Sequence, residues 1–219
     1  MGGIRLEIDG REIAAERGER LLWVARDAGI EIPSLCSRRG DEPPFAACRL
    51  CWVEIEGRPR PVTSCTVPAE DGLVVQTRSP AVDRLVASAF ELLLTHHRLE
   101  CRRCPANHAC ALQQIARSRR LKLRPSRVSR LERRETVDDS HPAVRLDQSK
   151  CVLCGKCVWA CHELGRGVLD FAFRGLETVV STFEGRALAE TPCDGCLACA
   201  RVCPVGALSA RRDPQPSRP

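Results

Sequence analysis

The sequence lacks the common motifs of a catalytic chain. It contains no glycine-rich GxGxxG segment for a dinucleotide, no Walker loop for a nucleoside triphosphate, and no Ser/His/Asp arrangement that stands out. The enzyme classes that depend on these motifs therefore receive no support. We expect the chain not to be catalytic by itself.

Long apolar runs are absent as well. The N-terminal stretch MGGIRLEIDG has no apolar segment of the kind a signal peptide requires, and no later run approaches transmembrane length. We therefore expect a cytoplasmic protein without direct membrane insertion. In a reducing cytosol, closely spaced cysteines favour metal binding over disulfides, and the odd count of 15 would leave one thiol unpaired.

Cysteine is abundant, and one stretch of the chain indicates which kind of metal site the cysteines form. Residues 95–110, THHRLECRRCPANHAC, hold three cysteines, with His97 four positions ahead of the first. A 4Fe–4S cluster takes four protein ligands, so three cysteines leave one iron that His97 can bind. Four cysteines lie upstream and eight downstream, so 15 cysteines and one histidine make sixteen ligands, enough for four clusters. Spacing favours neither His96 nor His108, and His108 is the second choice.

The basic charge is less informative. The formal net charge of +6 counts every thiol as neutral, whereas four bound clusters would contribute roughly −7. Residues 102–134 hold eleven Lys/Arg and one acidic residue. We interpret this stretch as a solvated basic face or as a docking face for an acidic partner subunit. No aromatic residue interleaves it, so we expect no nucleic-acid partner.

Residues 1–78 are predicted to form a small β-rich domain. Apolar and polar residues alternate from the start, and Asp9-Gly10 is a hairpin turn signal. An apolar helical face follows and ends at Gly29. The expected elements are strands at 4–8, 12–15, 52–56 and 73–77 and a helix at 19–28.

Four cysteines of this domain are separated by eleven, two and thirteen residues, unlike the plant-type run. Zinc is the alternative metal, although zinc sites usually show two CxxC pairs and this segment has one. The segment CRLCWVEIEG, followed by SCT, resembles the N-terminal 2Fe–2S domain of the large iron–sulfur subunit of respiratory complex I, in which a β-grasp sheet holds the cluster in a long loop. Ala46 departs from the family's usual glycine. The resemblance implies a 2Fe–2S cluster bound by Cys36, Cys48, Cys51 and Cys65.

Residues 79–140 are predicted to be helical. Ser79-Pro80 is a helix cap followed by proline at the first helical position, and a second helix is expected at 109–119. The order His, three residues, Cys, two residues, Cys, five residues, Cys resembles the histidine-ligated cluster of the complex I family, iron-only hydrogenases and NAD-linked formate dehydrogenases. The resemblance implies a 4Fe–4S cluster bound by His97, Cys101, Cys104 and Cys110.

Residues 141–210 repeat the pattern CxxCxxCxxxC, the second copy lying forty-two residues after the first and ending before proline. This is the signature of bacterial two-cluster ferredoxins, in which the fourth cysteine of each run binds the other cluster. A hairpin is expected around Arg174-Gly175, and residues 211–219 are expected to be a disordered tail. We thus expect one 4Fe–4S cluster on Cys151, Cys154, Cys157 and Cys203, and another on Cys161, Cys193, Cys196 and Cys199.

The predicted fold class is α+β, with an N-terminal β-grasp 2Fe–2S ferredoxin domain, a helical His/Cys cluster domain and a C-terminal two-cluster ferredoxin domain. Over residues 1–210 the chain resembles most the small diaphorase subunits of bidirectional, NAD-reducing hydrogenases. The resemblance implies an electron relay through one 2Fe–2S and three 4Fe–4S clusters, between an NAD(H)- and FMN-binding flavoprotein subunit and a hydrogenase catalytic subunit. The same relay in an NAD-dependent formate dehydrogenase, with that enzyme's catalytic subunit, or in a complex I-like NADH dehydrogenase is the nearest alternative. A zinc-stabilised interaction module is the alternative of a different class.

Overall fold

The computed structural model describes residues 3–131 and 136–211 and combines helices with sheets, which confirms the predicted fold class. Its contacts divide the chain into two compact units, Met1–Leu93 and Leu94–Pro219. The three domain boundaries expected from the sequence stay predictions. Among the described residues, no helix is long and apolar enough to span a membrane.

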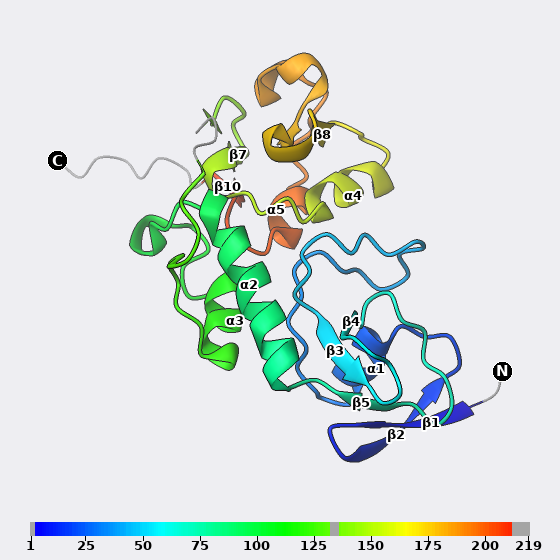
Figure 1. The fold of residues 1–219 in the computed structure, drawn as a ribbon. Helices are drawn as coiled ribbons and strands as arrows, with labels where there is room; N and C mark the ends of the chain where they lie inside the picture. The colour runs from blue at the N-terminus through cyan, green and yellow to red at the C-terminus, as the bar shows by residue number, and fades with distance from the viewer. Residues whose placement is uncertain (1–2, 132–135, 212–219) are drawn as a thin grey trace. The chain divides into compact units, whose positions relative to one another are not determined.

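The first unit is built on a five-stranded mixed sheet with the strand order β2-β1-β5-β3-β4. Strand β5 runs parallel to β1, and the other neighbouring pairs are antiparallel. The last strand thus lies in the middle of the sheet beside the first, as in a β-grasp fold (Figure 1). The strands are β1 (Gly3–Ile8), β2 (Arg11–Glu16), β3 (Trp52–Ile55), β4 (Val62–Thr63) and β5 (Val74–Gln76).

Alternation explains how β1 meets the core. Ile4, Leu6 and Ile8 are at most 3% exposed, and the residues between them face solvent. Asp9 and Gly10 make the turn to β2, both with positive φ angles of 52° and 78°. A two-residue turn of this kind twists in the same sense as the strands, so it joins them without splaying.

Helix α1 (Leu21–Asp27) packs against this sheet through its apolar face. A helix this short is marginal on its own in water, so tertiary packing must hold it in place. Burying each large aliphatic side chain contributes about 1.5–3 kcal/mol. The helix residues that share a core with the strands are Leu21, Leu22, Val24 and Ala25.

A long loop without helix or strand connects α1 to β3. Two of its residues, Ala46 and Arg49, adopt positive φ angles of 49° and 54°. This left-handed conformation favours glycine, because a Cβ comes too close to the following carbonyl oxygen. Position 46, where the resemblance leads us to expect glycine, therefore has a backbone that prefers glycine.

Helix α2 (Pro80–His96) begins where the sequence predicts. Ser79 Oγ accepts a hydrogen bond from the Val82 amide at 3.1 Å, which satisfies one of the free N–H groups at the helix start. The buried apolar residues of α2 recur every fourth position and so form one apolar face. They are Val82, Val86, Phe90 and Leu94.

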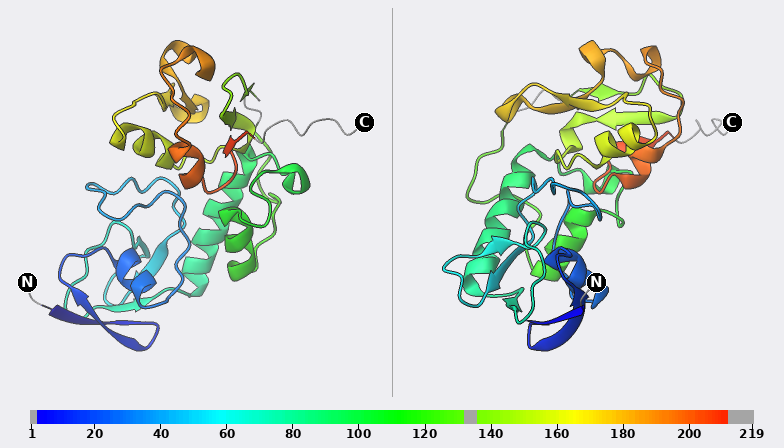
Figure 2. Two further views of the ribbon diagram at one scale, coloured as in Figure 1. Left: turned by 180° about the vertical axis from the view of Figure 1, so that it is seen from behind. Right: turned by 90° about the vertical axis from the view of Figure 1, so that its right-hand side faces the viewer.

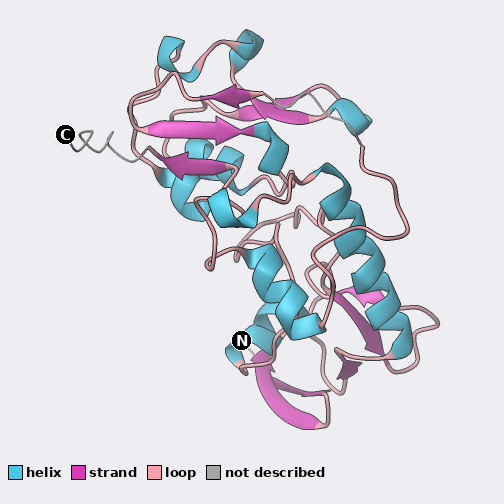
Figure 3. Cartoon of the chain, turned by 90° about the vertical axis from the view of Figure 1, so that its left-hand side faces the viewer, coloured by secondary structure: helices cyan, strands magenta, loops and turns pink. Residues whose placement is uncertain are grey.

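The second unit combines short helices with two small sheets (Figures 2 and 3). One antiparallel sheet has the order β10-β7-β6, and β8 pairs with β9 as the hairpin predicted around Arg174-Gly175. Helices α4 and α5 pack against each other. The elements are α3 (Ala111–Arg119), α4 (Lys156–Glu163), α5 (Ala198–Val202), β6 (Val137–Asp138), β7 (Val144–Asp147), β8 (Asp170–Ala172), β9 (Val179–Ser181), β10 (Leu208–Ala210) and the single turns η1 (Cys101–Arg103), η2 (Gln148–Lys150), η3 (Gly175–Glu177), η4 (Phe183–Gly185) and η5 (Leu188–Glu190).

The three-stranded sheet is not predicted by the sequence. Its strands are two to four residues long, too short for an alternating pattern to stand out. The tail expected from residue 211 lies outside the described residues except for its first member. Arg211 donates its N–H to the Ala143 carbonyl at 2.8 Å, next to the pairing of β10 with β7.

Replacing Ala46 by glycine should stabilise the first unit. The change removes a Cβ from a left-handed residue, which we expect to raise the free energy of unfolding by up to about 1 kcal/mol. For a chain of this size that corresponds to about 2–4 °C in the anaerobic thermal midpoint. Ala47, exposed and without a positive φ angle, is the matched control, and Ala47→Gly should be neutral or destabilising. A lower midpoint for Ala46→Gly than for the parent chain would contradict this account.

Candidate metal centres

The four cysteines predicted to bind a 2Fe–2S cluster are all buried in the first unit, with 1–5% exposed. Two backbone amides point at their sulfur atoms. The Leu35 amide donates to Cys48 Sγ and the Cys48 amide to Cys36 Sγ, each at 3.4 Å. Such donors favour the thiolate form. The site therefore offers sulfur atoms already supplied with hydrogen-bond donors.

These four thiols interact as two pairs. Cys36 donates a hydrogen bond to Cys48, which lowers the pKa of Cys48 to about 6 and raises the pKa of Cys36. Cys51 donates likewise to Cys65, whose pKa falls to about 7 while the pKa of Cys51 rises. In each pair, one ionised sulfur is stabilised by the proton of the other. A metal cluster that binds all four as thiolates would replace those two protons by iron charge.

Two buried hydroxyl groups test whether a cluster fits here. Ser37 and Ser64 adjoin Cys36 and Cys65, are 6% and 0% exposed, and neither Oγ has a hydrogen-bond partner of good geometry. Ser37 still lies near enough to Cys65 to lower the pKa of that thiol. A buried hydroxyl without a partner costs about 1–3 kcal/mol. Sulfur of a bound 2Fe–2S cluster would supply an acceptor for Ser37, and four buried thiols are at hand as ligands, so the residues fit that group.

His97 and His108 have different environments. His97 is 6% exposed, and its Nδ1 lies 2.9 Å from the Lys150 carbonyl oxygen. A carbonyl can only accept, so Nδ1 carries the proton and Nε2 of the neutral ring keeps a free lone pair, the form that binds metals. Burial lowers the pKa of His97, which favours the neutral ring. His108 is exposed, and its backbone N–H is taken by Gln113.

The three cysteines that follow His97 gather at the start of α3. Cys110 is the N-cap of α3 and is buried, whereas Cys101 and Cys104 are half-buried. Burial raises the pKa of the Cys110 thiol, and the nearby charges of Cys104 and Cys101 raise it further. Repulsion among ionised sulfurs is relieved when cations bind between them.

A glycine lets this motif approach the second cysteine repeat closely. A Cβ on Gly206 would lie 3.0 Å from Cys104 Sγ, and the φ angle of Gly206 is +74°. The Ala111 amide donates to the Pro204 carbonyl at 2.9 Å. The segment that follows Cys203 therefore lies directly against the histidine/cysteine motif.

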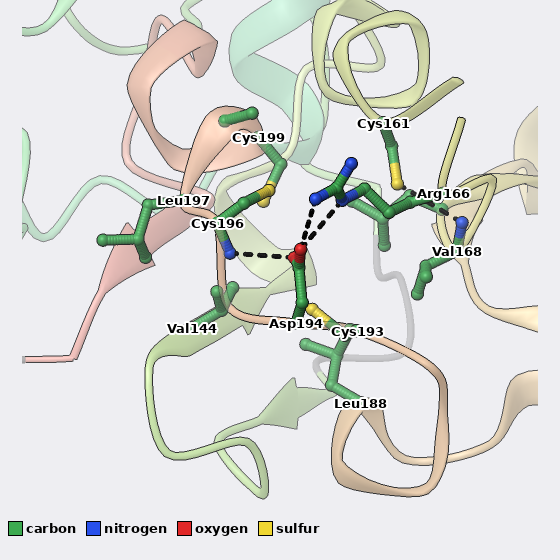
Figure 4. Close-up of a pocket in the computed structure, with 12 residues that line it drawn as sticks. Val144, Cys161, Arg166, Val168, Leu188, Cys193, Asp194, Cys196, Leu197 and Cys199 are labelled. Carbon is green, nitrogen blue, oxygen red and sulfur yellow. Dashed lines mark hydrogen bonds and ion pairs between the residues drawn. The ribbon is translucent and has the colours of Figure 1, made fainter. Parts of the chain in front are cut away.

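The two cysteine repeats line two separate cavities, and each cavity takes cysteines from both repeats. In Figure 4, Cys161 comes from the end of α4, and the other three cysteines come from α5 and the segment before it. A two-cluster ferredoxin that exchanges its fourth cysteines would need this grouping, and the assignment of ligands to clusters stays a prediction. One cavity is lined by Cys161, Cys193, Cys196 and Cys199, and the other by Cys151, Cys154, Cys157 and Cys203.

Neighbouring thiols also shift the pKa values of these cysteines. Burial raises the pKa of Cys157, and the charges of Cys151, Cys154 and Cys203 from its own cavity and of Cys199 from the other cavity add to that effect. The pKa of Cys199 rises to about 11 for the same reasons, with Cys161 among its neighbours. Backbone amides again donate to sulfur, at 3.3–3.4 Å. These amides are those of Leu153, Val168 and Leu208, and they point at Cys151, Cys161 and Cys203 respectively.

The two repeats also share an unusual backbone. Leu153 and Gly155 have φ angles of 52° and 75° in the first repeat, and Gly195 and Leu197 have φ angles of 70° and 60° at the equivalent positions of the second. Each repeat thus places one leucine in the left-handed region, where it costs about 1–2 kcal/mol. Because this strain recurs at both cavities, we infer that it serves to aim the amides and cysteines.

An ion pair flanks the cavity lined by Cys196. Arg166 Nε donates to Asp194 Oδ2 at 3.0 Å, and Asp194 Oδ1 accepts from the Cys196 amide at 3.1 Å. The hydrogen bond from Arg166 lowers the pKa of Asp194 to about 2. Figure 4 shows the guanidinium beside the sulfur atoms, where its positive charge offsets thiolate charge.

A mononuclear site is not preformed in the part of the chain that the structure describes. No group of three or more His, Cys, Asp or Glu side chains there stands close enough to hold a single metal ion. A cluster is larger than one ion and spaces its ligands more widely. The zinc alternative therefore gains nothing from the geometry.

Several residues near the sites are not predicted from the sequence. Ser37 and Ser64 carry only the weak signal of standing next to a cysteine, and Asp147 and Lys150 carry none. The described cations of the basic stretch are exposed, as either interpretation requires, except Arg119, which is only 7% exposed; residues 132–134 lie outside the described residues. The exposed cations in it include Arg102, Arg103, Arg117, Arg120, Lys122 and Arg124.

Comparison with family models matches three segments. Residues 3–80 match a 2Fe-2S iron-sulfur cluster binding domain, residues 87–122 match an NADH-ubiquinone oxidoreductase-G iron-sulfur binding region, and residues 190–209 match a 4Fe-4S binding domain. The models therefore support one 2Fe–2S domain and 4Fe–4S binding regions.

Among curated proteins, the chain is 34% identical over 209 residues to the NADPH-Fe(3+) oxidoreductase subunit alpha of Geobacter sulfurreducens, covering 95% of this chain and 24% of the relative. It is 33% identical over 213 residues to the NADP-reducing hydrogenase subunit HndD of Solidesulfovibrio fructosivorans, covering 95% of this chain and 36% of that one. The chain thus spans about a quarter to a third of these relatives.

A chain of one solved structure is similar to this chain over nearly the whole length of both. A chain in the crystal structure of NAD+-reducing [NiFe]-hydrogenase in the H2-reduced state aligns with a TM-score of 0.86 and 31% identity. The alignment covers 99% of this chain and 90% of that one.

The exchange of fourth cysteines can be tested with two serine variants. Cys203→Ser should disturb the same EPR signal as Cys151→Ser, because both cysteines line one cavity, and should leave the other signals in place. Cys193→Ser is the matched control, since it changes the other cavity. A spectrum of Cys203→Ser that matches Cys193→Ser instead would mean that each repeat binds its own cluster.

Removing the Ser37 hydroxyl, which lies near enough to Cys65 to lower the pKa of that thiol, should lower the midpoint potential of the 2Fe–2S centre by tens of millivolts. A hydroxyl donor to sulfur stabilises the more negative, reduced state; a hydrogen bond to a charged acceptor is worth about 1.5–3 kcal/mol, and about 59 mV equals ~1.4 kcal/mol. Ser37→Ala is therefore measured by redox titration of the visible spectrum. Ser34→Ala is the control, because Ser34 Oγ already accepts from Arg26 at 2.8 Å. Equal potentials for Ser37→Ala and the parent chain would remove this role.

Proposed function

Since the chain belongs to the family of iron–sulfur electron-transfer subunits shared by NAD(P)-linked hydrogenases and complex I-like enzymes, we propose that it relays electrons between an NAD(H)-binding flavoprotein and a hydrogenase catalytic subunit. The observation that carries the hydrogenase assignment is the likeness to a chain of an NAD+-reducing hydrogenase over nearly the whole length of both chains. The reducing cytoplasm is the compartment we propose for it.

The proposal places four clusters on sixteen ligands. The first unit would hold one 2Fe–2S cluster, and the second would hold three 4Fe–4S clusters. The grouping of cysteines around two cavities and the buried, carbonyl-bonded His97 support this assignment. The ligand sets are Cys36, Cys48, Cys51 and Cys65; His97, Cys101, Cys104 and Cys110; Cys151, Cys154, Cys157 and Cys203; and Cys161, Cys193, Cys196 and Cys199.

When bound, such clusters exchange single electrons, and four protein ligands leave them no open position for a substrate. The chain's own residues set where and how easily that exchange occurs. Eight of the fifteen cysteines are buried, which keeps water from them, and the amides that donate to Cys48, Cys151, Cys161 and Cys203 stabilise negative charge on sulfur. Changes of a few tenths of a volt are within the reach of such contacts across iron–sulfur proteins.

A flavoprotein partner follows from electron counting. A nicotinamide delivers two electrons as hydride, whereas iron–sulfur centres accept one at a time, so a flavin must stand between them. The sequence has no GxGxxG segment with which to bind the dinucleotide itself. We therefore propose an NAD(H)- and FMN-binding subunit on one side of the relay and the hydrogenase catalytic subunit on the other.

The nearest alternative is the same relay in another NAD(P)-linked enzyme. The match to the NADH-ubiquinone oxidoreductase-G region and the likeness to an NADPH-Fe(3+) oxidoreductase subunit support a complex I-like enzyme equally at the level of this module. A formate dehydrogenase is the remaining member of this class. Co-purification of the catalytic subunit distinguishes them.

The isolated chain should be reduced by dithionite but not by NADH. Anaerobically purified protein is expected to contain about fourteen irons, the sum for one 2Fe–2S and three 4Fe–4S clusters. It should be brown, whereas a zinc module would be colourless. Adding the flavoprotein partner should restore reduction by NADH, which is measured by bleaching of the visible spectrum. Six or fewer irons on undamaged protein would overturn the four-cluster assignment, and rapid reduction by NADH without flavin would overturn the relay.

A further inference from the structure

A group of three buried polar residues lies next to His97, and none of the three is a predicted metal ligand. Asp147, Ser149 and Lys150 are 6%, 4% and 8% exposed and form the turn η2 between β7 and Cys151. Burying charged groups costs several kcal/mol per ion unless they are well paired and hydrogen-bonded. A turn that only connected a strand to a cysteine would not need them.

The Asp147 carboxylate accepts hydrogen bonds from both of the other polar residues in this group. Its Oδ1 accepts from the Ser149 amide at 3.1 Å and from Ser149 Oγ at 2.5 Å, and its Oδ2 accepts from the Lys150 ammonium. Its own amide donates to the Ala207 carbonyl at 2.7 Å, which ties the turn to β10. The Asp147 carboxylate therefore holds Ser149 and Lys150 in η2, whereas Gln148 is held separately by its amide, which donates to the Thr136 carbonyl at 3.0 Å, and by its side chain, which donates to the Val180 carbonyl.

The turn presents two consecutive carbonyls to the residues that follow α2. The Ser149 carbonyl accepts from the Arg98 amide at 2.7 Å, and the Lys150 carbonyl accepts from His97 Nδ1 at 2.9 Å. A metal-binding histidine generally needs such an acceptor, which fixes the ring orientation and increases the electron density on the other nitrogen. Resting on the proposed role of His97 as a ligand, we propose that Asp147 is a positioning residue for His97, because it holds the Lys150 carbonyl against Nδ1–H.

The same peptide joins two predicted sites. The Lys150 carbonyl receives His97, and the next residue, Cys151, lines the cavity shared with Cys203. Asp147 therefore sets the relative position of a ligand of one site and the backbone of the next. Its effect should be largest at the histidine site, which depends on the carbonyl directly.

A second carboxylate in the same unit provides a matched control. Asp138 Oδ1 accepts from the Ser140 amide at 3.0 Å and from Ser140 Oγ at 2.6 Å, the same Asp-x-Ser turn as Asp147 and Ser149. Its other oxygen accepts from the Leu188 amide at 2.7 Å, whereas the carbonyl that lies against His97 Nδ1 belongs to Lys150 in the other turn. Substitutions at Asp138 thus change the same Asp-x-Ser turn at a place where it does not position His97.

The experiment compares neutral variants, because removing the charge of Asp147 alone would shift a nearby potential whatever its role. In the Lys150→Met background, Asp147→Asn keeps an oxygen acceptor for Ser149, whereas Asp147→Ala removes it. Both pairs of changes eliminate the buried charges together, which avoids an uncompensated ion that could prevent folding. His97→Ala identifies the EPR signal that depends on His97.

In anaerobic redox titrations of the full chain, Asp147→Ala/Lys150→Met should raise the midpoint of the His97-dependent signal relative to Asp147→Asn/Lys150→Met. The expected change is about tenfold in the reduction equilibrium, which is about 59 mV for one electron. Pulsed EPR should show a weakened imidazole nitrogen coupling in the alanine variant only. Asp138→Ala and Asp138→Asn should leave both measurements unchanged.

The outcomes separate this inference from the proposed function. If His97→Ala removes no cluster signal, the ligand assignment of His97 fails and the proposed function must be revised. If His97→Ala removes one signal but the alanine and asparagine variants at 147 give the same potential and nitrogen coupling, only the role of Asp147 is overturned. A shift equally large at Asp138 would likewise overturn it, because the effect would then be general to such turns.

Discussion

The arrangement of both units depends on keeping buried sulfur ionisable. A thiolate removed from water needs donors in its place, and the best placed donors are backbone amides that no helix or strand is using. Many of the predicted ligands accordingly lie in irregular segments. Cys36, Cys48 and Cys51 lie in the long loop of the first unit, and Cys151, Cys154, Cys193 and Cys196 precede α4 and α5 in the second. The helices hold the ends of these segments and carry Cys157, Cys161 and Cys199 themselves.

The sequence predicts those parts of the structure that depend on local pattern. Cysteine spacing predicts which cysteines of the second unit lie together, Ser79-Pro80 predicts the start of α2, and Asp9-Gly10 predicts the first turn. It does not predict the sheet β10-β7-β6, because strands of two to four residues carry no usable period. Leu153 and Leu197 also give no signal, since leucine rarely adopts the left-handed conformation that both have here.

Contacts between distant segments explain the remaining surprises. Nothing local links His97 to Lys150 or Gly206 to Cys104; each pair meets only because the second unit folds its repeat against the histidine motif. Asp147 shows why such contacts cannot be predicted from the local sequence. In sequence, the run DQSK reads as an ordinary polar turn, whereas in the structure its carboxylate is buried and satisfies three donor groups.

The β8–β9 hairpin lies between the two cysteine repeats, and the residues that bound it, Cys161 and Cys193, line one cavity. The excursion that contains the hairpin is therefore closed at its base by the site itself, whatever its length. Because loop-closure entropy grows only slowly with the number of residues, lengthening such an excursion costs little once its base is fixed. The turn around Leu176, which is 65% exposed, can accordingly accept an inserted label or a foreign peptide at little entropic cost.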